Sequence, residues 1–119
     1  MGACRVMAVI RLAWPHRDSH PNSRVHWSRR AKANKAMRSA AYYLAKASGI
    51  YVPGEGDVAV TLTFYPPDNR RRDRDNLLSN CKAYLDGIAD ALKVNDSRFV
   101  PTIRMSDKTG GYVEVEVRS

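Results

Sequence analysis

Two aspartates, Asp73 and Asp75, stand one residue apart in a cationic run that directly precedes a helical pattern. Salt bridges on a helix surface normally place opposite charges three or four residues apart, so this spacing is not typical of them. Close carboxylates instead suit Mg²⁺, which takes one or two carboxylates together with waters and substrate phosphate. Guanidinium groups match phosphate oxygens, and the run contains Arg70, Arg71, Arg72 and Arg74. The run predicts metal-dependent chemistry on a phosphodiester, with an exposed charged loop as the alternative.

A third carboxylate, Asp96, and a lysine, Lys82, are candidates for the same site. Carboxylates that converge repel one another, and a divalent cation relieves that repulsion and can activate a water for attack on phosphorus. Lys82 would then stabilise the charge that develops on the phosphate; its alternative is a lysine at the helix edge. One difficulty is distance, because a helix of about eighteen residues from Asp75 spans about 27 Å. Asp96 reaches the site if residues 93–96 return along this helix, or if the helix ends near Gly87.

The charge balance of 20 Lys and Arg against 12 Asp and Glu gives a net charge of +8, which favours a polyanionic partner. Residues 23–47 contain seven cations and no acid, on what reads as a helix with its preceding loop. A basic helix of this kind can follow phosphates, and the alternative is a solvated face. The predicted DNA-binding residues here are Arg24, Arg29, Arg30, Lys32 and Lys35.

The two cysteines, Cys4 and Cys81, are too few for a disulfide framework and have no metal-ligand spacing. They are expected to be reduced thiols that contribute to packing. The chain shows no signal-peptide pattern and no apolar run long enough to span a bilayer. We therefore expect a cytoplasmic protein without membrane association.

Other chemistries find less support in the sequence. There is no glycine-rich phosphate loop, and no pattern typical of a serine nucleophile. His16, His20 and His26 share one loop but have neither cysteines nor a helical zinc-binding frame beside them. His26 and Trp27, next to Arg24, could stack on bases; alternatively, Trp27 packs at the start of the first helix.

The chain of 119 residues is long enough for one domain, residues 1–119, with one core. Alternating apolar residues predict strands at residues 6–12 and 57–65. Between them a helix is expected over residues 29–46, with Ser28 as its N-cap and Ser48-Gly49 as its end. Its apolar stripe consists of Ala33, Met37, Ala40, Ala41 and Leu44.

A second helix is expected over residues 75–92, followed by a short turn. Residues 102–106 and 112–117 then read as two strands joined in a hairpin by Gly110-Gly111. The order β-α-β-α-β-β predicts an α+β two-layer sandwich, a mixed sheet with two helices on one face. The core stripe of the second helix is expected to consist of Leu78, Cys81, Leu85, Ile88 and Leu92.

Three segments together carry a resemblance to a known family. They are Arg72-Asp73-Arg74-Asp75-Asn76-Leu77-Leu78, Lys82-Ala83-Tyr84-Leu85-Asp86-Gly87-Ile88 and Asn95-Asp96-Ser97-Arg98-Phe99. In these segments the chain resembles the RusA family of Holliday junction resolvases. The likeness extends more loosely over most of the chain, with Asp-x-Asp-Asn-Leu as its specific core.

The resemblance implies a homodimeric, Mg²⁺-dependent endonuclease that cuts two opposed strands of a four-way DNA junction in recombination and repair. Mn²⁺ is expected to substitute for Mg²⁺. The family's catalytic, metal-binding aspartates match Asp73, Asp75 and Asp96, and its lysine is matched by Lys82. In the familiar pattern the lysine follows the second aspartate by four residues, where this chain has Ser79, whereas Lys82 follows by seven. Both spacings return to the same helix face, so the role can survive.

We therefore expect a structure-selective endonuclease of the bacterial cytoplasm, encoded by a cell, a prophage or a phage. The alternative from another class is a basic DNA-binding accessory protein without catalysis. A third interpretation is a nuclease for branched or single-stranded DNA in general, which would share the site but differ in substrate.

Overall fold

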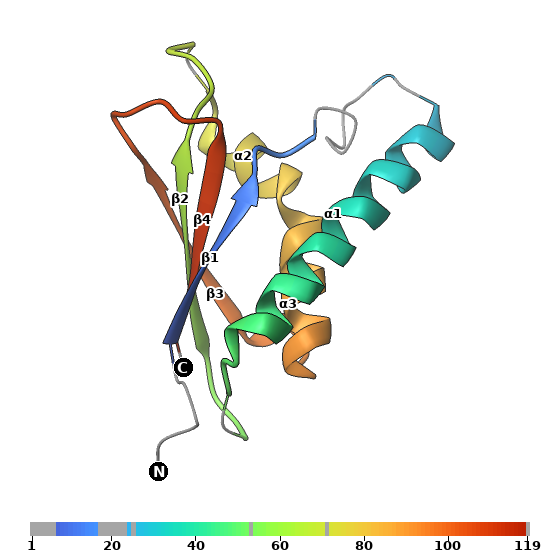
Figure 1. Cartoon of the computed structure of the whole chain (residues 1–119), viewed down its shortest axis with the longest axis vertical. Helices are drawn as coiled ribbons and strands as arrows, with labels where there is room; N and C mark the ends of the chain where they lie inside the picture. Colours follow the sequence, from blue (N-terminus) through green and yellow to red (C-terminus); the bar gives the residue numbers. More distant parts are fainter. Residues whose placement is uncertain (1–6, 17–23, 25, 53, 71, 119) are drawn as a thin grey trace.

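The fold is an α+β two-layer sandwich (Figure 1). The structure is a computed structural model, which describes residues 7–16, 24, 26–52, 54–70 and 72–118. The order of its elements is close to the predicted one, with one additional helix. The elements are β1 (Met7–Ala13), α1 (Trp27–Ser48), β2 (Val58–Tyr65), α2 (Arg74–Asn80), α3 (Lys82–Leu92), the 3₁₀ turn η2 (Asp96–Arg98), β3 (Phe99–Met105) and β4 (Tyr112–Arg118).

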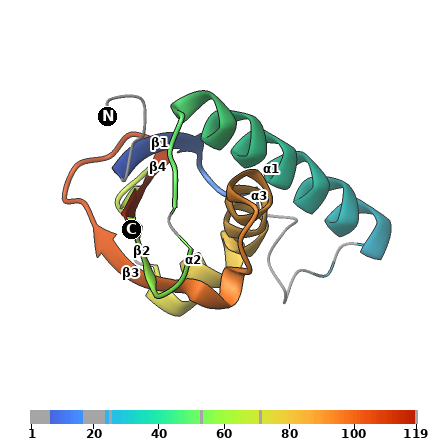
Figure 2. The same cartoon turned by 90° about the horizontal axis from the view of Figure 1, so that it is seen from below.

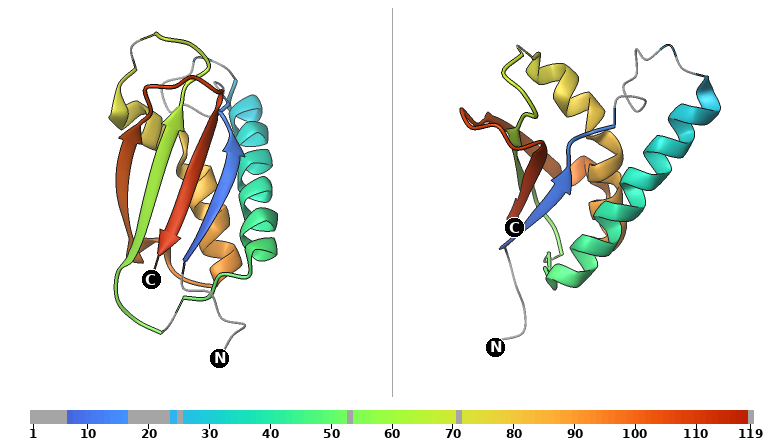
Figure 3. Two further views of the ribbon diagram at one scale, coloured as in Figure 1. Left: turned by 60° about the vertical axis from the view of Figure 1, so that its left-hand side comes forward. Right: turned by 45° about the horizontal axis from the view of Figure 1, so that its top comes forward.

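The sheet has the strand order β1-β4-β2-β3. Strand β4 pairs antiparallel with both β1 and β2, and β3 pairs parallel with β2, so the sheet is mixed as expected. The predicted hairpin is wrong, because β2 lies between β3 and β4 (Figure 3, left). The glycine-containing connection instead passes the end of β2, where the amides of Gly110 and Gly111 donate to the carbonyl oxygens of Pro66 and Tyr65.

One face of the sheet carries the core, as strict alternation along the strands requires. In β2, Val58, Val60, Leu62 and Phe64 are fully buried, and the residues between them are more exposed. The same alternation holds in β1, and the described part of that strand confirms the prediction. The remaining core residues of the sheet are Ala8, Ile10, Leu12, Val113, Val115 and Val117.

The three helices of the described residues lie on this core face, and no described element covers the opposite face of the sheet (Figures 2 and 3). Helix α1 lies alongside α3, and both turn small or apolar residues towards the sheet. The arrangement confirms the predicted two-layer architecture. It also leaves the outer sides of α1 and α3, where the charged residues lie, facing solvent.

Helix α1 begins earlier than predicted, and its N-cap is His26 rather than Ser28. The His26 side chain accepts a hydrogen bond from the backbone N–H of Ser28 at 3.1 Å, which serves an N–H that the helix leaves unpaired. The buried stripe also differs, because Ala40 and Leu44 are exposed and Ala45 is buried. The helix does end at Gly49, whose left-handed φ of 71° glycine adopts without strain.

The single helix predicted for residues 75–92 is two helices, α2 and α3, that meet at Cys81. Cys81 departs from helical geometry with φ −93° and ψ 5°, and its buried side chain anchors the junction in the core. Burial raises the pKa of its thiol to about 12, consistent with a packing role. Cys4, the other cysteine, lies outside the described residues. Within the described part of the chain, no helix is long and apolar enough to cross a membrane.

Candidate active site

Asp73 and Asp75 lie where the loop after β2 enters α2. Asp73 is the N-cap of that helix, and its Oδ1 accepts hydrogen bonds from the backbone N–H groups of Asp75 (2.8 Å) and Asn76 (3.4 Å). A carboxylate is favourable there, because the first amides of a helix lack partners and the helix dipole attracts negative charge. Asp75 is exposed in the first turn. The predicted pair therefore lies together at one helix end, with one Asp73 oxygen committed to capping.

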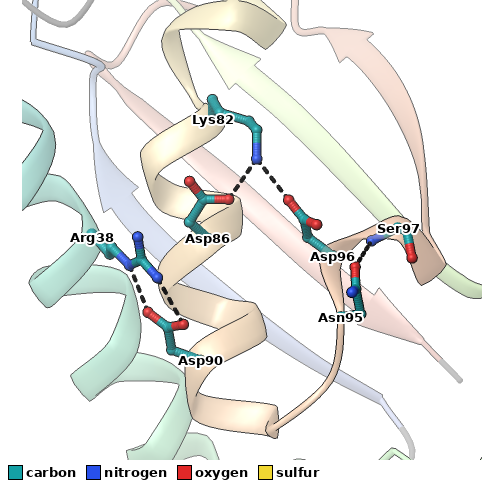
Figure 4. Close-up of polar contacts among 7 residues, drawn as sticks. All are labelled: Arg38, Lys82, Asp86, Asp90, Asn95, Asp96 and Ser97. Carbon is teal, nitrogen blue, oxygen red and sulfur yellow. Dashed lines mark hydrogen bonds and ion pairs between the residues drawn. The ribbon is translucent and has the colours of Figure 1, made fainter.

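Asp96 reaches this side of the molecule because the chain reverses directly after α3. Lys93 adopts a left-handed conformation with φ 57°, and the following residues run back along the helix (Figure 4). The Asn95 side chain then caps the short turn η2 by accepting a hydrogen bond from Ser97 N at 2.9 Å. This is the first of the two routes that the sequence left open. The second is wrong, because Gly87 lies inside α3.

The ammonium group of Lys82 lies between two carboxylates at the start of α3 (Figure 4). Its Nζ donates to Asp86 Oδ1 and to Asp96 Oδ2, each at 2.6 Å. These contacts raise the pKa of Lys82, with the Asp86 hydrogen bond as the larger cause, and the Lys82 ammonium lowers the pKa of Asp96. Lys82 is therefore charged at neutral pH and bridges α3 to η2. Asp86 lies in the same motif segment as Lys82, and no role was predicted for it.

A cavity of about 290 Å³ opens beside this ion pair, between α2, α3 and β3. Ser79 and Lys82, which occupy the four-residue and seven-residue positions after Asp75, both line it. The break at Cys81 therefore does not separate the two positions onto different faces. The lining consists of Leu78, Ser79, Lys82, Leu85, Asp96, Phe99 and Pro101.

A larger groove of about 460 Å³ runs between α1 and α3, and Lys82 lies at its edge as well. Arg30 and Lys35, both predicted to bind DNA, line it from α1. Arg38 also lines it and was missed, although its spacing from Lys35 places it on the same side of the helix. Arg38 holds Asp90 of α3 through two hydrogen bonds, at 2.6 and 2.9 Å (Figure 4). The full lining is Arg30, Asn34, Lys35, Arg38, Ser79, Lys82, Ala83 and Asp86.

Other predicted DNA-binding residues lie outside this groove. Arg24 precedes α1, and Arg29 and Lys32 are exposed on that helix. The loop before α2 presents Arg70, whose side chain is 84% exposed, and α2 begins with the exposed Arg74.

Arg72 differs from its neighbours because its guanidinium is turned into the protein. It donates to the carbonyl oxygens of Asp68 (3.2 Å) and Arg70 (2.8 Å) and to Asp68 Oδ1 (2.8 Å), and it lies over the Trp14 ring. Its side chain is only 17% exposed. These contacts give Arg72 a structural role in shaping the loop, and its contact with DNA stays a prediction. Arg71 lies outside the described residues.

The structure unites only some of the predicted site residues. It brings Asp96 to Lys82 and keeps Asp73 beside Asp75. In the described portion of the chain, however, no three His, Cys, Asp or Glu residues are grouped so that they could hold one metal ion. The expected convergence of Asp73, Asp75 and Asp96 around one cation is therefore not present within a single described chain.

No family model matches the chain. The chain is 41% identical over 122 residues to a protein of Xylella fastidiosa (strain Temecula1 / ATCC 700964) named "Uncharacterized protein". The match covers 98% of this chain and 80% of that protein.

Proposed function

The chain belongs to the same family as this Xylella fastidiosa protein, and we propose that it is a Mg²⁺-dependent endonuclease that resolves four-way DNA junctions. The observation that carries the proposal is the contact between Asp96 and Lys82. These residues come from two separate motif segments, 14 positions apart, and meet at 2.6 Å beside a cavity. Both segments belong to the resemblance to the RusA family, and their meeting supports a shared site.

The donor chemistry of the aspartates fits Mg²⁺. Asp73 and Asp75 supply hard oxygen donors, and Mg²⁺ in phosphoryl-transfer sites often uses only one or two carboxylates with waters and substrate. Asp73 and Asp75 would hold the ion within one chain, and Asp96 would act beside them as the partner of Lys82. When bound, the ion would polarise the scissile phosphate and supply a nucleophilic hydroxide.

The protein's own cations support the handling of the phosphodiester. Lys82 is charged and lies at the edge of both cavities, so it can donate to a non-bridging phosphate oxygen and stabilise the charge that develops there. Arg30, Lys35 and Arg38 line the groove that leads away from Lys82 between α1 and α3. We propose that this groove receives the DNA backbone next to the cut.

A homodimer is part of the proposal, because two opposed incisions match a protein with two-fold symmetry. One site in each subunit would cut one of two strands related by the symmetry of the junction. Recombination and repair are the processes in which such junctions arise.

A second candidate function is DNA binding without catalysis. The arrangement of the carboxylates favours it. Asp96 is paired with Lys82, and one oxygen of Asp73 caps α2, so neither carboxylate is fully available to a metal ion. A binding protein would use the same basic groove but would leave junction strands intact. Mg²⁺ dependence of strand cleavage separates the two functions.

The decisive experiment compares the wild-type protein with Asp75→Asn on a synthetic four-way junction, with Mg²⁺ and with EDTA. We expect paired cuts by the wild type in Mg²⁺ only, with junction binding retained and cleavage lost in Asp75→Asn. Asp107→Asn is the matched control, since Asp107 is an exposed aspartate in the connection between β3 and β4. Unchanged cutting by Asp75→Asn would refute the site, and intact junctions with every variant would favour the binding protein. Equal cleavage of junction, duplex and single strands at matched salt would indicate a general nuclease.

A further inference from the structure

Lys82 forms salt bridges with both Asp86 and Asp96, and Asp86 is the least exposed of the three residues. Its side chain is 27% exposed, against 40% for Asp96 and 62% for Lys82. Asp86 follows Lys82 by one helical turn, so the helix itself fixes the distance between their backbones. Asp96 belongs to a different element, η2, and lines the same cavity as Lys82. The two contacts to Lys82 are thus equal in length but different in origin.

The two carboxylates also differ in how firmly the chain holds them beside Lys82. Asp96 belongs to the 3₁₀ turn η2 after α3, so its position depends on how the connection from Lys93 folds back. Asp86 lies on α3 itself and has no part in the proposed metal set. A lysine side chain has many rotamers, and one fixed carboxylate within its own helix would keep its ammonium group near the cavity.

From this geometry we propose, on the basis of the proposed function, that Asp86 is a positioning residue that holds the Lys82 ammonium at the scissile phosphate. Asp86 acts through Lys82, although its carboxylate also lines the α1–α3 groove. The expected effects on rate and on binding are therefore different. Loss of Asp86 slows the chemical step, because a misplaced catalytic group can reduce a rate by about 100-fold, while junction affinity does not fall and the Mg²⁺ requirement stays the same.

The test is single-turnover cleavage of a synthetic junction by Asp86→Asn and Asp86→Glu over a range of Mg²⁺ concentrations, with junction affinity measured in Ca²⁺. We expect Asp86→Asn to cut between about 10-fold and 100-fold more slowly than the wild type. The Kd for the junction should not rise, and the Mg²⁺ concentration at half-maximal rate should not change. Asp86→Glu keeps the charge one methylene further out and should recover part of the rate.

Asp107→Asn is the matched control, because Asp107 is exposed in the connection between β3 and β4 and lines neither cavity. It should cut at the wild-type rate. Equal slowing of Asp86→Asn and Asp107→Asn would overturn the positioning role and indicate a general effect of removing a negative charge. A higher Mg²⁺ requirement of Asp86→Asn would also overturn it, because Asp86 would then act as a ligand. Wild-type cutting by Asp86→Asn would overturn the role and leave the proposed function intact, whereas an inactive wild type would overturn the proposed function and the role with it.

Discussion

A methyl group built on Gly87 would collide with the backbone carbonyl oxygen of Arg38, so α1 and α3 touch backbone to backbone at this point. The nearest side chain on the facing helix is the buried Ala41, whose Cβ would lie 3.1 Å away. From the sequence, Gly87 was considered only as a place where the second helix could end. The structure shows that its missing side chain allows the close approach of the two helices whose outer edges form the basic groove.

We therefore expect Gly87→Ala to destabilise the protein, although alanine favours a helix more than glycine does. The facing atom belongs to backbone, which cannot rotate away, and overpacking of this kind costs about 1–3 kcal/mol. Urea unfolding followed by circular dichroism measures the change. Gly54→Ala is the control, because a Cβ at Gly54 meets no atom within 4 Å. Gly87→Ala with the stability of the Gly54→Ala variant would contradict the close contact.

Reversal of one groove charge should weaken DNA binding. Lys35→Glu places a carboxylate in the α1–α3 groove, whereas Lys46→Glu makes the same change in the last turn of the same helix, outside that groove. We expect Lys35→Glu alone to lower junction affinity and to reduce the dependence of log K on log salt by about one unit. Fluorescence anisotropy at several salt concentrations provides both values. Identical losses in the two variants would mean that net charge, not the groove, determines binding.

The two described arginines of the loop before α2 should separate stability from DNA binding. Arg72→Ala removes hydrogen bonds to two backbone carbonyl oxygens and to Asp68, so we expect a loss of about 1–3 kcal/mol in unfolding free energy. Arg70→Ala removes a mainly exposed side chain and should change stability little while lowering DNA affinity. Thermal unfolding and anisotropy of both variants test this separation. A destabilised Arg70→Ala and an unaffected Arg72→Ala would reverse the assignment.

The Arg38–Asp90 ion pair should make stability depend on pH in one direction. Arg38 lowers the pKa of Asp90 below its ordinary value of 3.8, so the folded state prefers the carboxylate. The stabilisation is therefore complete above the unfolded-state pKa and is lost as the pH falls through the lower folded-state value. We expect Asp90→Asn to have a lower Tm than the wild type at pH 7, and the difference to shrink below pH 3.8. A Tm difference that grows towards acid pH would contradict this account.

Local patterns in the sequence were sufficient for much of the fold. The alternation in β2 identified its buried side chains correctly, and Gly49 marked the end of α1 because left-handed backbone favours glycine. The three helices on one face follow from amphipathic strands and helices that share one core. The N-cap of α1 was harder to identify, because it is the His26 side chain that accepts a hydrogen bond from the backbone N–H of Ser28, the residue expected to be the cap.

The order of the strands and the composition of the site depended on contacts between distant segments. A period of two residues identifies the buried face of a strand but not its neighbour, so the position of β2 between β3 and β4 was not visible in the sequence. The residue types proposed for phosphodiester chemistry were readable from their spacing. Only the tertiary structure turned Arg72 inward and brought Asp96 back to Lys82, because both depend on how loops fold over the finished core.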